Sequence, residues 1–240
     1  MTANRPFVRF RGWRLIVVLA IAGVGLSGCS SLVPGADRDP PRLYDLSPKN
    51  TFSKKLPRAR WQLVVELPVA AAGLSSARIA LKRHHLRLEY FARTAWTDTT
   101  PKMIQTLIIE SFENSNRIVS VGRTSTGLRS DYVLQTGLRE FQAEYTKGKP
   151  EDQGSKTGPK VRISLTAKLV MMPERTIIAS RTIKYVRFAK NNDMESIVLA
   201  FDEALGKTLK RLVEWSIIEG QRGWYRRRQA QRRSLSMRRR

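Results

Sequence analysis

The sequence predicts an α+β fold: a single domain whose mostly antiparallel sheet carries two amphipathic helices on one face. Two patterns support this expectation. Several segments alternate apolar and polar residues, as strands with one buried face do, and two others repeat apolar residues at helical spacing. Their order is strands, helix, strands, helix, with few parallel crossovers implied. At 240 residues and 41% hydrophobic content, the chain is long and apolar enough to bury a core.

Alternating segments separated by turn residues define the expected strands. The first is 62–67, and the next two, 78–82 and 86–90, form a hairpin. A polar stretch at 146–160, rich in glycine and proline, predicts a mobile loop inside a second hairpin. The remaining expected strands are 118–121, 132–145, 161–170 and 176–188.

Two helices are expected. The first spans 101–114, where Pro101 suits the first helical turn and the polar residues before it can cap the helix. The second opens at Asn192, which together with Glu195 resembles a capping box. Their apolar stripes predict a dry core shared with one face of the sheet. The stripe residues are Met103, Ile104, Leu107, Ile108 and Phe112 in the first helix, and Met194, Ile197, Val198, Phe201, Leu205, Leu209, Leu212 and Val213 in the second.

The positive charge of the chain is concentrated at its two ends. Lys and Arg number 44 against 20 Asp and Glu, which gives a net charge of +24. Residues 1–28 hold four Arg and no acid, residues 221–240 hold nine Arg and no acid, and the middle of the chain keeps +11. The domain between the ends is therefore only moderately basic, and more than half of the net charge of the chain lies in its two ends.

The amino-terminal segment has the pattern of a secretory signal. Four arginines precede an uncharged apolar run that is too short for a membrane-spanning helix, which needs about 20 residues. The run ends in Leu26-Ser27-Gly28-Cys29. This motif resembles the lipobox of bacterial lipoproteins, so residues 1–28 are expected to be a signal peptide and Cys29 to carry the covalent lipid. The alternative is an uncut signal anchor in which Cys29 is an ordinary buried residue.

The segment after the lipobox is expected to form the anchor and an extended tether, residues 29–60, ahead of a domain at 61–220. It holds five prolines and shows neither a strand nor a helix period, although 44–48 could form a short strand or docking segment. By the lipoprotein resemblance, Ser30 in place of an aspartate favours the outer membrane, facing the periplasm, over the inner membrane. The single cysteine excludes an intramolecular disulfide and a Cys-rich metal site.

No residue pattern indicates catalysis or a metal, and apart from the lipid on Cys29 no cofactor is expected. His84 and His85 are the only histidines, and neighbours on a strand point to opposite faces. Glycines within 148–157 resemble a phosphate-binding loop, but their spacing fails the required pattern and no strand-to-helix context surrounds them. Carboxylates are few and scattered, with no close pair bracketing a plausible cleft. The chain is therefore expected not to be an enzyme.

The arginine-rich tail, 221–240, is expected to be disordered. In a cytosolic chain its arginines and aromatic residues would suggest nucleic acid. An exported, lipidated chain instead meets anionic lipid headgroups or acidic proteins, which offer similar phosphate and carboxylate chemistry. A solvated tail with no partner is an equal alternative. The residues expected to make an anionic contact are Arg226, Arg227, Arg228, Arg232 and Arg233.

Four short motifs follow the lipobox in a distinctive order. They are Tyr44-Asp45-Leu46, Ala77-Arg78-Ile79, Tyr90-Phe91-Ala92-Arg93-Thr94-Ala95-Trp96 and Pro101-Lys102-Met103-Ile104. In this order they resemble the ABC-type transport auxiliary lipoprotein family, over most of residues 29–218. The resemblance implies a non-enzymatic partner of a periplasmic protein with a mammalian-cell-entry (MCE) domain and of an ABC permease and ATPase. The tail and the 146–160 segment depart from the family pattern.

Two functions follow from these observations. The first is a transport accessory that docks an MCE-type protein and helps lipids or other hydrophobic compounds pass between membranes. The second is a structural lipoprotein that contacts anionic polymers through its basic tail, with no transporter. Neighbouring genes for an ATPase, a permease and an MCE protein would favour the first.

Overall fold

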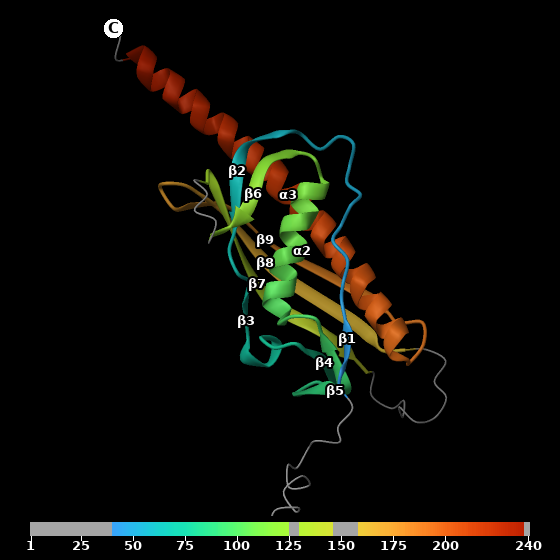
Figure 1. Cartoon of the computed structure of the whole chain (residues 1–240). Helices are drawn as coiled ribbons and strands as arrows, with labels where there is room; N and C mark the ends of the chain where they lie inside the picture. Colours follow the sequence, from blue (N-terminus) through green and yellow to red (C-terminus); the bar gives the residue numbers. More distant parts are fainter. Residues whose placement is uncertain (1–39, 125–129, 146–157, 238–240) are drawn as a thin grey trace, which may run out of the picture. The chain divides into compact units, whose positions relative to one another are not determined.

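The computed structural model describes residues 40–124, 130–145 and 158–237 (Figure 1). Each expected strand and both helices are present in this part of the chain, some with shifted ends; the strand expected at 62–67 begins and ends earlier. The strands are β1 (Arg42–Tyr44), β2 (Ala59–Val65), β3 (Val69–Ala70), β4 (Arg78–His84), β5 (Arg87–Trp96), β6 (Ile118–Arg123), β7 (Tyr132–Glu144), β8 (Lys160–Met171) and β9 (Thr176–Phe188), and the helices are α2 (Thr100–Asn114) and α3 (Met194–Met237).

These strands form one mixed sheet, so the prediction of a mostly antiparallel sheet is wrong. The central strand β7 runs parallel to β2, β3 and β4 and antiparallel to β8. The pairs β1–β5 and β2–β6 are also parallel, whereas β4–β5 and β8–β9 are antiparallel. Alternation of apolar residues reports which face of a strand is buried and carries no information on the direction of the neighbouring strand. The parallel strand pairs could therefore not be predicted from the alternation of apolar and polar residues.

Both helices lie against the same face of the sheet, α3 across β8 and β9 and α2 beside β2 and β6 (Figure 1). Strand β8 shows how the sequence builds that face. Every second side chain along it is apolar and at most 1% exposed: Val161, Ile163, Leu165, Ala167 and Leu169. The side chains between them point to the face that the helices leave uncovered.

The N-terminus of α3 is capped by a residue other than the one predicted. Asp193 accepts hydrogen bonds from the backbone N–H (2.8 Å) and the hydroxyl (2.9 Å) of Ser196, and these bonds lower the pKa of the Asp193 carboxyl. The amide oxygen of Asn192 instead accepts a hydrogen bond from the Tyr145 hydroxyl at 2.8 Å. The capping box predicted from Asn192 is therefore wrong by one position, because both residues have cap-forming side chains.

The segment predicted as a tether belongs to the domain from Pro41 onward. Leu46 and Leu56 are buried in the core, and the backbone N–H of Ser47 donates to the Asp202 carboxylate on α3 at 2.7 Å. The domain therefore begins about twenty residues before the predicted boundary at 61. Two isolated buried leucines produce neither a strand period nor a helix period, so the sequence pattern indicated a tether.

Helix α3 continues through the arginine-rich tail as far as Met237, so the prediction of disorder is wrong for residues 221–237. Gly220 and Gly223 are buried, which keeps the helix against the domain where this stretch begins. Arg, Gln and Ala are good helix formers. Beyond that contact, the last turns project past the sheet (Figure 1).

An aromatic cluster joins the sheet to α3. Trp96 of β5, Phe141 of β7 and Phe201 of α3 are each at most 1% exposed. Their ring centroids lie 5.1 to 5.8 Å apart. Contacts of this kind add about 0.5–1.5 kcal/mol each beyond the burial of apolar area. The cluster thus connects three elements that are far apart in the sequence.

Replacing Phe201 by Ala should lower the free energy of unfolding by about 3–5 kcal/mol, because a buried cavity replaces the ring at the centre of this cluster. Leu199 lies on the same helix and is 63% exposed, so Leu199→Ala should change stability by less than about 0.5 kcal/mol. Chemical denaturation followed by circular dichroism measures both. Equal midpoints for the two variants would contradict the assignment of this core.

Candidate functional site

The predicted lipid-attachment motif lies outside the described residues. It comprises Leu26, Ser27, Gly28 and Cys29, and its role stays a prediction. The glycine-rich segment within 148–157 also lies outside them. The surfaces that the structure describes therefore all belong to the folded domain.

His84 and His85 lie at the turn between β4 and β5, where both are exposed. Their rings stack on each other with centroids 4.4 Å apart. Within residues 40–124, 130–145 and 158–237, no group of three or more His, Cys, Asp or Glu side chains could hold a metal ion. No helix in the same ranges is both long and apolar enough to cross a membrane.

Close packing at two glycines holds the C-terminal half of α3 on the sheet. A Cβ atom built on Gly220 would lie 2.4 Å from the Trp61 ring, and one on Gly223 would lie 2.9 Å from the Tyr132 hydroxyl. The Tyr132 hydroxyl donates a hydrogen bond to the carbonyl of Gly220 at 3.0 Å. Trp61 and Tyr132 meet edge to face with centroids 5.0 Å apart. We call Trp61, Tyr132, Gly220 and Gly223 the helix seat.

Burial raises the pKa of Tyr132 to about 12, and the neighbouring Asp131 carboxylate adds to the shift. Asp131 is held in place because its carboxylate accepts the backbone N–H of Gln62 at 2.9 Å. The Tyr132 phenol therefore stays protonated and continues to donate its hydrogen bond across the whole physiological pH range.

Arg227 contacts the body of its own domain. Its guanidinium donates to the carbonyl of Met172 at 2.7 Å and to the Glu174 carboxylate at 3.0 Å, both in the turn between β8 and β9. It therefore differs from the other four arginines expected to make an anionic contact. No sequence pattern indicates this difference, because Glu174 lies 53 residues earlier in the chain.

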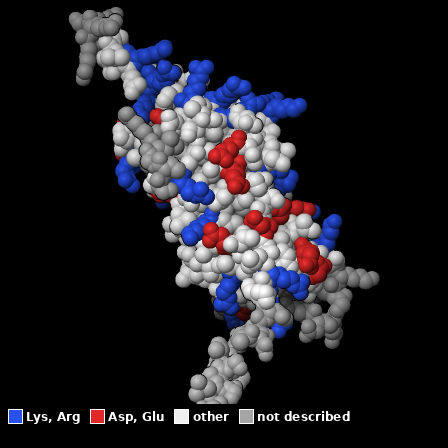
Figure 2. All heavy atoms as spheres, in the orientation of Figure 1, with Lys and Arg blue, Asp and Glu red and all other residues white. Residues whose placement is uncertain are grey.

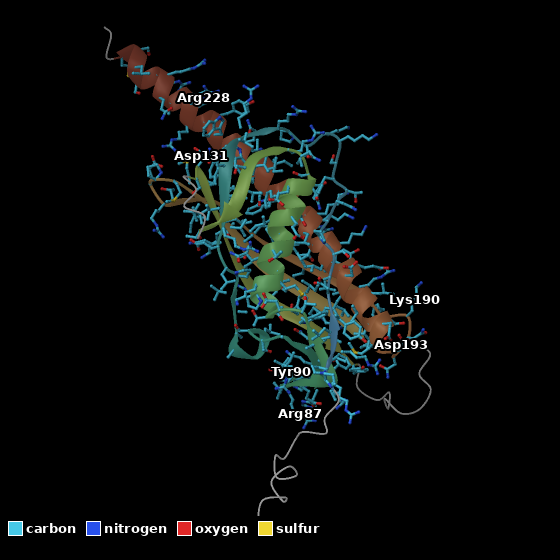
Figure 3. All side chains as sticks on the ribbon, in the orientation of Figure 1. Arg87, Tyr90, Asp131, Lys190, Asp193 and Arg228 are labelled. Carbon is cyan, nitrogen blue, oxygen red and sulfur yellow. The ribbon has the colours of Figure 1, made fainter. Side chains whose placement is uncertain are left out.

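The other four arginines lie on the projecting end of α3. No ion pair connects Arg226, Arg228, Arg232 or Arg233 to any carboxylate of the described residues. Figure 2 shows basic side chains gathered around this end and acidic ones over the middle of the same face. In Figure 3, Arg228 lies near this end, and Lys190 and Asp193 lie at the opposite end of the helix.

A second exposed surface lies on the face of the sheet that the helices leave uncovered. Arg162 donates to Glu144 at 3.0 Å, and Lys160 lies 3.4 Å from the same carboxylate. Burial alone would raise the pKa of Glu144, but the hydrogen bonds from Arg162 and its neighbours lower it. Beside these ions stand Val186 and Phe188 of β9, paired in register with Arg162 and Lys160. We call these five residues the β9 patch.

Strand β9 is also an edge of the sheet, because β8 is its only strand partner in the described part of the chain. It is 13 residues long, and its exposed hydrophobic side chains include Phe188 (64%) and Val186 (37%). A long edge with apolar side chains presents free backbone donors and acceptors to another chain. The β9 patch and edge are therefore suited to binding an extended protein segment.

A polar groove of about 610 Å³ lies between α3, β9 and the segment that follows β1. Its lining carries both signs of charge, Lys49 and Lys207 as cations and Asp202 and Glu203 as anions. Glu203 is paired with Arg187 of β9 across the groove. Both carboxylates of the groove are therefore already engaged, Glu203 by Arg187 and Asp202 by the backbone N–H of Ser47.

The chain matches the family described as the ABC-type transport auxiliary lipoprotein component over residues 44–213. This match covers well over half of the chain. The chain belongs to this family. The resemblance inferred from the motifs after the lipobox is thereby confirmed. The description of this family names a lipoprotein component of ABC-type transport and no class of enzyme.

Two solved structures are similar in fold to this auxiliary lipoprotein. The crystal structure of a protein from Xanthomonas campestris is 29% identical, aligns with 76% of this chain and 98% of its own, and gives a TM-score of 0.69. A second, uncharacterized crystal structure shares the fold at 14% identity, with a TM-score of 0.56 over 73% of this chain and 97% of its own.

A relative by sequence is an uncharacterized protein of Bradyrhizobium diazoefficiens. It is 26% identical over 193 residues, which is 80% of this chain and 49% of the relative. The auxiliary lipoprotein therefore spans about half the length of this relative.

The helix seat predicts opposite effects for two glycines of α3. Gly220→Ala should lower the free energy of unfolding by about 1–3 kcal/mol, since its methyl group would overlap the Trp61 ring. A Cβ on Gly206 meets only the end of the Lys49 side chain at 3.9 Å, so Gly206→Ala should raise stability by about 0.4–1 kcal/mol. Thermal unfolding of both variants measures the signs. A stabilising Gly220→Ala would show that the helix does not rest on Trp61.

The raised pKa of Tyr132 predicts a loss of stability at high pH. The unfolded chain ionises this phenol near pH 10, whereas the folded chain holds it protonated up to about pH 12. Its contribution is therefore fully present below pH 10 and is lost as the pH rises from 10 to 12, by at most about 3 kcal/mol. The free energy of unfolding of Tyr132→Phe should fall less steeply over this interval. Identical slopes for the wild type and the variant would contradict the shift.

Proposed function

We propose that the protein is a lipid-anchored accessory of an ABC transport system that moves lipids or other hydrophobic compounds across the cell envelope, and that it acts by binding an MCE-type partner. The observation that carries this proposal is the family match over residues 44–213. The lipobox-like motif before the domain supports an outer-membrane anchor that faces the periplasm. The scattered carboxylates and exposed histidines support a role in binding rather than catalysis.

The anchor in this proposal is Cys29. A thiol can carry a thioether-linked lipid, and each buried methylene contributes about 0.8 kcal/mol, so several acyl chains hold a protein firmly. The described domain begins at Pro41, which leaves only residues 30–40 as a tether. That segment reaches at most about 40 Å when extended. The anchor would therefore keep the domain close to the membrane surface.

The β9 patch and the free edge of β9 are the proposed docking surface for the transport partner. Backbone pairing along an edge strand supplies affinity, and pockets for alternate side chains supply specificity. Val186 and Phe188 provide exposed apolar contacts at one end of this edge, next to two cations that are paired with Glu144 and Glu140. An apolar contact beside paired charges can be buried without leaving an uncompensated ion.

The second candidate function is a structural lipoprotein that contacts anionic polymers without any transporter. The observation in its favour is the cluster of arginines on the projecting end of α3, which carries no balancing carboxylates among the described residues. This candidate predicts envelope binding that survives loss of the β9 patch.

Lipidation at Cys29 should be visible as incorporation of radiolabelled palmitate into the protein in cells. Cys29→Ala removes the only thiol and should abolish the label. Ser30→Ala changes the neighbouring residue without touching the thiol and should retain it. Equal labelling of the wild type and Cys29→Ala would show that the motif is not a lipidation site.

Docking through β9 should be visible in mild-detergent pull-downs of the tagged protein from native membranes. The wild type should recover an MCE-type protein, identified by mass spectrometry, together with its permease and ATPase. The double variant Val186→Asp, Phe188→Asp should recover roughly tenfold less, because two charges enter the apolar part of the contact.

Leu86→Asp is the matched control for this experiment. Leu86 is 82% exposed at the turn between β4 and β5, so the substitution adds a charge away from β9. It should leave recovery unchanged. Recovery of abundant envelope proteins only, by the wild type as well as by the variants, would favour the structural lipoprotein instead.

A further inference from the structure

The projecting end of α3 carries four arginines, Arg226, Arg228, Arg232 and Arg233, that form no ion pair with any carboxylate of the described residues. Its like-charged pair Arg228 and Arg232 is spaced one helical turn apart, an arrangement that destabilises a helix by a few tenths of a kcal/mol. Arg222 pairs with Glu219 at 2.8 Å, and no acid follows Glu219 in the chain. The domain therefore supplies no carboxylate that would reduce the repulsion among the remaining arginines, and an anion from outside the domain would reduce it.

These arginines share one side of the helix. At about 100° per residue, Arg222, Arg226 and Arg233 fall within about 40° of one another, and Arg228 and Arg232 extend this set to an arc of about 160°. Tyr225 lies within the arc and is 59% exposed. We call this side the arginine arc. The seat glycines and Arg227, which contact the domain, lie on the remaining part of the circumference.

The arginine arc has a fixed position at one end of the domain. The helix seat and the Arg227 contacts hold the helix just before it projects. At the other end of α3, the Tyr44 hydroxyl donates to Glu195 at 3.3 Å, so β1 lies beside the first turn of the helix. The 38 residues from Glu195 to Arg233 correspond to about 57 Å. The chain thus enters the domain at one end, and the arginines lie at the other (Figures 1 and 3).

We propose that the arginine arc binds the surface of an anionic phospholipid bilayer and lays α3 along it, as a second membrane contact in addition to the proposed lipid anchor. A flat surface reaches one side of a helix, which fits an arc of this width. The arc has no continuous apolar stripe, so the contact is peripheral and depends on charge. Exposed tyrosine is favoured at a membrane interface.

A lipid anchor alone leaves the domain free to rotate above the membrane, whereas a second contact at the arginine arc would restrict that rotation. The proposal rests on the proposed function only through the anchor at Cys29. Guanidinium groups bind phosphate in a forked geometry, so lipid phosphates suit these side chains.

Vesicle co-sedimentation tests the proposal with the chain from residue 29 carrying Cys29→Ser, which has no lipid of its own. The probes are vesicles of phosphatidylcholine alone and vesicles with phosphatidylglycerol added. The chain should partition onto the anionic vesicles and not onto the neutral ones, and salt should weaken the binding. The quadruple variant Arg226→Gln, Arg228→Gln, Arg232→Gln, Arg233→Gln should lose roughly tenfold or more of this partitioning.

The matched control removes four exposed positive charges elsewhere: Lys102→Gln, Arg139→Gln, Lys168→Gln and Lys190→Gln. It has the same net charge as the arc variant and should retain wild-type binding, and circular dichroism verifies that both are folded. Equal losses in the two variants, or equal wild-type binding to both kinds of vesicle, would overturn the proposal. So would arc-dependent binding to polyglutamate without binding to the anionic vesicles, because that result indicates an acidic protein partner. The assay contains no transport partner, so its failure is separate from failure of the pull-down.

Discussion

Helix α3 is longer than the sheet beneath it, and this difference in length decides where the arginine-rich end of the chain lies. Its 44 residues correspond to about 66 Å, whereas the longest strands, of 13 residues, reach only about 43 Å. Burial of Ile197, Phe201, Leu205, Leu209 and Leu212 holds the first part of the helix against β8 and β9. A continuous helix packed in this way has to leave the sheet before it ends. The projecting arginine-rich end therefore follows from the packing of the core.

The helix seat determines where this departure occurs. Trp61 and Tyr132 come from neighbouring parallel strands, and both press on glycines of α3, which lets the helix approach the sheet more closely than any side chain would allow. Arg227 then connects the helix to the turn between β8 and β9. Each of these contacts joins residues that lie more than 50 residues apart in the sequence. Together they couple the orientation of the projecting end to the hydrophobic core.

The sequence predicted elements with a regular apolar period and missed contacts that depend on single residues. The stripes of both helices and the alternation along β8 made those elements visible. The direction of the strands around β7 was not visible, because alternation is the same in parallel and antiparallel neighbours. The burial of Leu46 and Leu56 was not visible either, because two isolated apolar residues do not create a strand or helix period. The composition of the arginine-rich tail indicated disorder. Packing at Gly220 and Gly223 instead continues α3 into this segment.

The same limits apply to the functional surfaces. The arginines were identified from composition, but Arg227 could be separated from the others only by its distance to Glu174. The β9 patch had no motif at all, because Glu144, Arg162 and Phe188 are brought together by strand register. The described domain thus exposes two surfaces of different chemistry, an apolar sheet edge and a basic helix end.

The central claim is that α3 is one continuous helix that carries its arginines on a rigid projection. The most direct test is a distance measurement between spin labels at Leu199→Cys and Ser234→Cys in a Cys29→Ser background, since both positions are exposed. A continuous helix predicts a narrow distribution near about 52 Å. A broad distribution weighted towards shorter distances would show that the helix ends before its arginines, and would contradict the account.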